Sequence, residues 1–183
     1  MKRLFLIGGL VTAFLLLVVA ASAQKANFAG TWLLDKAKSQ NISPRWQGAD
    51  KVTLTITQDD KTISLENKVE GGQPPQGGGG GNGGGGGMGG GRGGGGGPQS
   101  FNLDGKEATS DVTFGQNTGQ RTTKATMSAN SAELMTKMVF GDRNSSTTQK
   151  LSLSDGGKTL TVVTHREGGQ QQAPDSTAVY TKQ

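Results

Sequence analysis

Residues 51–69, KVTLTITQDDKTISLENKV, alternate apolar and polar side chains on both sides of a short acidic turn. Val52, Leu54 and Ile56 fall on one face of an extended chain, and threonines fall on the other. The alternation resumes after residues 59–61. This pattern predicts a β-hairpin with one apolar face and one hydroxyl-rich face.

Similar short segments, separated by turn residues, continue to the end of the chain. Asp104-Gly105 is a two-residue turn signal, and it predicts a hairpin joining the segments on either side of it. The segments expected as strands after the first one are 51–58, 63–69, 101–103, 106–112, 120–127, 132–140, 145–153, 158–165 and 176–181. No helix is expected.

Sequential hairpins of this kind form an antiparallel meander, and closing the meander removes its exposed edges. The predicted fold is therefore all-β: an up-and-down meander of about 8–10 strands closing into a small barrel. A two-sheet sandwich has the same sequence pattern and remains the alternative.

Upstream of the hairpin, residues 28–34 read FAGTWLL and open the first strand. Phe28, Gly30 and Trp32 are interpreted as structural residues that close one end of the barrel. Trp46 lies in the segment before the second strand, where it is either a lid at the barrel mouth or a cover for the core edge.

The first 23 residues have the pattern of an export signal. Lys2 and Arg3 precede an apolar stretch at 4–20, and Ala-Ser-Ala follows at 21–23. The alternative is a membrane anchor, but about 17 residues is the short limit for a span. We expect a cleaved signal peptide (1–23), an exported protein in the periplasm or medium, and no stable membrane span after cleavage.

The mature chain, 24–183, is predicted to be a single domain interrupted by a flexible Gly-rich loop at 71–98. That segment has almost no apolar surface to offset the entropy of ordering it. The alternatives are an adhesive low-complexity arm and a linker between two domains. Residues 24–70 hold too few strands for a core of their own, which argues against the linker.

Composition argues against several function classes. The chain has 19 basic and 14 acidic residues, and its Lys and Arg are scattered, so no nucleic-acid-binding face is indicated. There is no Cys and one histidine, His165, which is interpreted as an ordinary strand-end residue. Asp59-Asp60 is assigned to turn chemistry rather than to a metal site. We expect no enzyme activity, no metal and no cofactor.

Four segments carry a resemblance to a known group of proteins. They are NFAGTWLLDKAKS at 27–39, LDGKE at 103–107, LSLSDGGKTLTV at 151–162 and VYTKQ at 179–183. In this order they resemble the secreted bacterial lipocalin-like domain proteins. The resemblance implies a calycin-like barrel and an exported location, and it implies no particular activity.

Two positions depart from that resemblance. Lipocalins stack an arginine of the last strand near the tryptophan that matches Trp32, whereas here the last strand offers Lys182, and Arg166 lies before the preceding loop. Related sequences also tend to have a tryptophan in the region that corresponds to 127–134, where this chain has none.

The expected function is binding of a small apolar or amphipathic molecule inside a monomeric barrel. The alternative is an envelope or extracellular interaction module, in which the same residues form a filled core and the Gly-rich loop contacts a partner. The candidate lining residues are Leu54, Ile56, Ile63, Leu65, Leu134, Met138, Phe140, Leu151, Leu160 and Val162.

Overall fold

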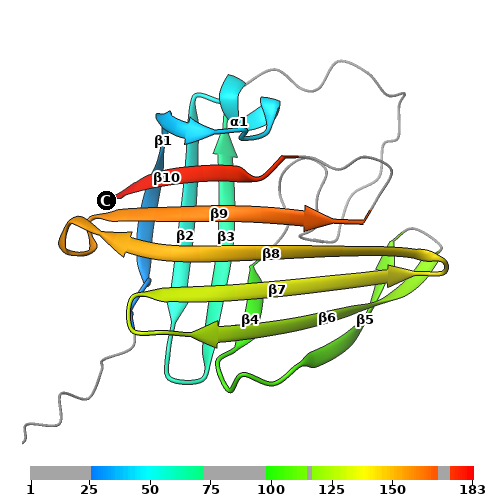
Figure 1. Cartoon of the computed structure of the whole chain (residues 1–183). Coiled ribbons are helices and arrows are strands. Elements are labelled where there is room, and N and C mark those ends of the chain that lie inside the picture. The colour runs from blue at the N-terminus through cyan, green and yellow to red at the C-terminus, as the bar shows by residue number, and fades with distance from the viewer. Residues whose placement is uncertain (1–25, 72–97, 115–116, 169–173) are drawn as a thin grey trace, which may run out of the picture.

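The computed structural model describes residues 26–71, 98–114, 117–168 and 174–183 (Figure 1). The predicted signal peptide lies outside the described residues, as does the predicted Gly-rich loop except for its two end residues. The strands are β1 (Gly30–Gln40), β2 (Lys51–Gln58), β3 (Thr62–Glu70), β4 (Gln99–Asn102), β5 (Ala108–Phe114), β6 (Asn117–Met127), β7 (Ser131–Phe140), β8 (Arg143–Ser154), β9 (Thr159–Glu167) and β10 (Ser176–Lys182).

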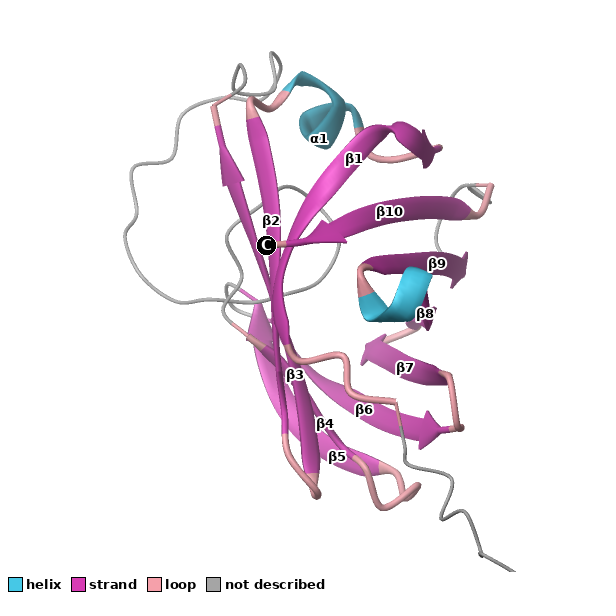
Figure 2. Ribbon diagram, turned by 90° about the vertical axis from the view of Figure 1, so that its left-hand side faces the viewer, coloured by secondary structure: helices cyan, strands magenta, loops and turns pink. Residues whose placement is uncertain are grey.

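All ten strands belong to one antiparallel sheet, in the order β4-β3-β2-β1-β10-β9-β8-β7-β6-β5. Consecutive strands pair with each other, except β4 and β5, which form the two edges of the sheet. β10 returns to pair with β1. The sheet curls so that β1–β3 cross behind β7–β10 (Figures 1 and 2). The predicted meander is confirmed as a nearly closed barrel, and the sandwich alternative is wrong because the sheet is continuous.

The predicted hairpin across Asp104-Gly105 is wrong. β4 and β5, which flank this turn, are the two edges of the sheet and do not pair with each other. The Asp104 carboxylate instead accepts a bond from the Lys106 N–H, and the Leu103 N–H donates to the Lys61 carbonyl. The turn therefore carries the chain across the seam of the barrel.

A short helix, α1 (Pro44–Gly48), was not expected. The Ser43 side chain caps it by accepting a bond from the Trp46 N–H, and proline occupies the start of the first turn. A single 3₁₀ turn, η1 (Asp155–Gly157), joins β8 to β9. Five residues are too few to reveal a helical apolar period, so only the Ser-Pro cap could have indicated α1.

The inward faces of the strands form one hydrophobic core. Its bulkiest fully buried members, Trp32, Tyr180, Phe28 and Phe101, lie among branched aliphatic residues. Burial raises the pKa of the Tyr180 hydroxyl, which therefore stays neutral. The core residues are Phe28, Trp32, Leu34, Ile42, Ala49, Val52, Leu54, Ile56, Ile63, Leu65, Phe101, Ala125, Ala132, Leu134, Leu151, Leu160, Val162, Ala178 and Tyr180.

Candidate ligand-binding interior

Trp32 in β1 and Phe28 just before this strand are fully buried. The Trp32 indole N–H donates to the Phe28 carbonyl at 2.9 Å, which satisfies the one polar atom of the ring. Lys182 pairs with Trp32 across β1 and β10, and its Nζ lies 5.2 Å from the ring centroid. The lysine thus supplies the cation that the lipocalin resemblance assigns to an arginine.

Gly30 has a φ of +142°, and a Cβ added there would lie 3.0 Å from Lys182 Cε. We expect Gly30→Ala to cost about 1–3 kcal/mol in urea unfolding, because alanine is strained at this φ and crowds the lysine. Gly48→Ala is the control, since an added Cβ there meets no atom within 4 Å. Equal stability of the two variants would contradict this role for Gly30.

Eight of the ten candidate lining residues are buried in the core: Leu54, Ile56, Ile63, Leu65, Leu134, Leu151, Leu160 and Val162. They pack with one another and with aromatic residues that the candidate set lacked, such as Phe101 and Tyr180. The other two, Met138 and Phe140, are only half-buried and lie outside the core. The structure therefore separates a packed apolar group from two apolar side chains near the end of β7.

A polar contact crosses the interior beside the apolar core. The Gln99 side-chain amide donates to the Thr136 hydroxyl at 2.6 Å, which connects β4 to β7 beside the seam. Gln99 pairs with the core residue Leu65, and Thr136 is itself buried two residues after the core residue Leu134. We call this contact the Gln99–Thr136 bridge.

Beyond the bridge, the inward face of β6 presents Arg121. It lies on the same face as the fully buried Ala125, because alternate residues of a strand share a face, and it pairs with Met138 of β7. Its Nε is buried without a hydrogen-bond partner among the described residues. None of the ion pairs found among those residues includes this guanidinium group.

Phe140 completes this part of the wall. A Cβ added at Gly119 would lie 2.4 Å from Phe140 Cδ1, so the ring packs against the glycine backbone of β6. Across the seam, Asn67 is the next inward residue of β3 beyond Leu65. Its Oδ1 is also buried with no partner in the part of the chain that the structure describes. We call Arg121, Met138 and Phe140 the β6–β7 wall.

Trp46 is half-buried on α1 and packs against the core. This contact agrees with the role of a cover for the core edge. A role as a lid stays a prediction.

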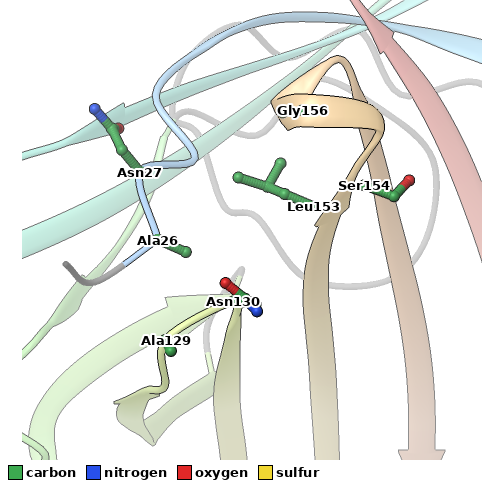
Figure 3. A pocket seen from close by; sticks show the side chains of 8 residues that line it. Ala26, Asn27, Ala129, Asn130, Leu153, Ser154 and Gly156 are labelled. Carbon is green, nitrogen blue, oxygen red and sulfur yellow. The ribbon is translucent and has the colours of Figure 1, made fainter. Parts of the chain in front are cut away.

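An open pocket of about 430 Å³ lies between the segment before β1 and the turns that join β6 to β7 and β8 to β9 (Figure 3). Leu153 and Ala26 are its half-buried apolar residues, and its polar lining is neutral. None of the ten candidate lining residues contributes to it. The lining residues are Ala26, Asn27, Ala129, Asn130, Leu153, Ser154, Gly156 and Gly157.

His165 lies on β9 with its ring exposed between two carboxylates. Its Nδ1 is 2.5 Å from Asp175 Oδ1, and its Nε2 is 3.3 Å from Glu167 Oε1. Hydrogen bonds to Asp175 and Glu167 raise the pKa of His165 above 6.5. The sequence interpretation missed this cluster because Asp175 precedes the next strand.

The direction of this shift gives a pH prediction. A histidine whose pKa is raised by folding adds stability that is fully present below 6.5 and lost as pH rises through the folded-state pKa. We expect NMR titration of His165 to give a midpoint above 6.5, and Asp175→Asn to lower it. A wild-type midpoint below 6.5 would rule out the Asp175 contact in solution.

No group of three or more His, Cys, Asp or Glu side chains suited to a metal is found among the described residues. In the same part of the chain, no helix is long and apolar enough to cross a membrane. No protein-family model matches the sequence, and a search of curated proteins finds no similar chain. The lipocalin-like resemblance thus stays a prediction that rests on the quoted residues.

Proposed function

We propose that this chain is an exported, monomeric, non-catalytic protein that binds one small amphipathic molecule at the β6–β7 wall. The observation that carries the proposal is the change in the inward face along β7. Leu134 is packed into the core, whereas Met138 and Phe140 are half-buried apolar side chains beside polar groups. A ligand there would bury apolar surface while its polar end met polar side chains.

The packed core restricts the kinds of ligand that the sequence analysis left open. Eight of the ten candidate residues already contact other core side chains, so a wholly apolar ligand filling the barrel would have to displace them. An amphipathic molecule that contacts only the end of the core requires no such rearrangement. For this reason the amphipathic alternative is retained and the apolar one is dropped.

Two methionines of β7 provide a matched test. Met138 faces inward, and Met135 lies on the opposite face of the same strand. With decanol as the probe in calorimetric titration, we expect Met138→Asn to weaken binding about tenfold and Met135→Asn to leave it unchanged. Equal losses in the two variants would contradict the proposal, as would absence of binding by decanol and by its anionic analogues decanoate and decyl phosphate.

The filled core also favours a second candidate, an interaction module that contacts a partner through its surface. The predicted Gly-rich loop that would serve this role lies outside the described residues. Deletion of residues 77–97 separates the two functions. Ligand binding should survive the deletion, whereas an interaction module should lose its partner while staying folded.

A further inference from the structure

We infer that the molecule bound at the β6–β7 wall carries an anionic oxygen group, a carboxylate or a phosphate, and that Arg121 recognises it. This inference rests on the proposed function and specifies the polar end of the ligand. Its starting observation is the buried Nε of Arg121, which has no hydrogen-bond partner among the described residues.

A buried donor without a partner is unusual in a folded protein. More than nine tenths of buried polar groups make a hydrogen bond, and leaving one unpaired is unfavourable. This donor belongs to a guanidinium group, which stays charged at any physiological pH, on a side chain that is half-buried as a whole. An oxyanion would supply both an acceptor and a countercharge, neither of which the described residues provide.

The geometry of guanidinium favours oxygen anions with two acceptor atoms. Its planar set of N–H donors matches carboxylate and phosphate, which it binds through paired hydrogen bonds. No other part of the wall competes for this role, because Met138 and Phe140 are apolar. The arrangement places a cation beside two half-buried apolar side chains, which suits an acid with an apolar tail.

Asn67 provides a second buried polar atom on the inward face of the sheet. Its buried Oδ1 is the other side-chain atom without a partner in the described residues. Asn67 lies two residues after Leu65 on β3, and Leu65 pairs with Gln99 of the bridge. Arg121 lies two residues before Thr123 on β6, and Thr123 pairs with Thr136 of the bridge. Among the described residues, buried polar atoms without a partner thus occur on both β3 and β6, each two residues beyond a residue that pairs with the Gln99–Thr136 bridge.

The test compares three probes of equal chain length: decanoate, decyl phosphate and decanol. We expect at least one of the two anions to bind the wild-type protein about tenfold more tightly than decanol. Arg121→Gln should abolish this preference while decanol binding persists, which also shows that the variant is folded. Arg121→Lys should keep part of the preference, because it retains the charge but not the paired donors.

Lys150→Gln is the matched control. Lys150 lies on the outer face of β8, 3.5 Å from Glu133, so its loss changes net charge by the same amount without altering the interior. Equal affinity of the wild-type protein for the anions and for decanol would overturn the inference but not the proposed function. A preference for the anions that survives Arg121→Gln would do the same. Absence of binding by all three probes overturns the proposed function, and the inference with it. A preference for only one of the two anions identifies which oxyanion the site accepts.

Discussion

Replacement of Trp32 by alanine should lower the free energy of unfolding by about 3–5 kcal/mol. The side chain is fully buried, its indole N–H is bonded to the Phe28 carbonyl, and Lys182 lies over its ring. The substitution removes all of these contacts and leaves a large cavity. Urea unfolding followed by circular dichroism measures the loss.

Trp46→Ala is the control for this experiment, because Trp46 is only half-buried on α1. It should cost less than half as much, on the order of 1–2 kcal/mol. A loss below about 1 kcal/mol for Trp32→Ala would show that Trp32 does not close the barrel. A larger loss of stability for Trp46→Ala than for Trp32→Ala would mean that Trp46, and not Trp32, is the main core tryptophan.

Leu151→Ala should lower the free energy of unfolding by about 2–5 kcal/mol. Leu151 was predicted to line a ligand cavity, yet it is fully buried and packs within the core, pairing with Ala132 and Val162. Truncation of a packed side chain leaves a void, whereas truncation at the wall of an existing cavity loses fewer contacts. Thermal and urea unfolding of the variant distinguish a packed core position from the wall of an existing cavity.

Leu153→Ala provides the comparison on the same face of the same strand. Leu153 is half-buried at the open pocket, so its truncation should cost clearly less than that of Leu151. A cost below about 1 kcal/mol for Leu151→Ala would mean that the interior is hollow at this level. The ligand would then be sought among the eight buried candidates rather than at the β6–β7 wall.

Strict alternation made most strands predictable from the sequence. β2 was predicted with its exact bounds, because Val52, Leu54 and Ile56 alternate with threonine along its whole length. The prediction of a hairpin at Asp104-Gly105 was wrong because a turn signal reports only local sequence. The partners of β4 and β5 depend on how the whole sheet closes. Period-two patterns identify strands, and they do not identify which strands become edges.

The site was harder to predict for a related reason. Leu134, Met138 and Phe140 share one face of β7, so alternation cannot distinguish the packed residue from the two that remain half-buried. The difference arises from what lies opposite each residue in the barrel. Arg121 was missed because its strand was treated as mostly polar, although its position four residues before Ala125 places it on the inward face.

The most direct test of the account is native mass spectrometry of the protein, purified gently from its own host. The account predicts a reproducible adduct that disappears on denaturation, has the mass of a small acidic amphiphile and is much less abundant in the Arg121→Gln variant. A clean unliganded mass, with no uptake of added decanoate, decyl phosphate or decanol, would contradict it and leave a filled barrel whose function lies on its surface.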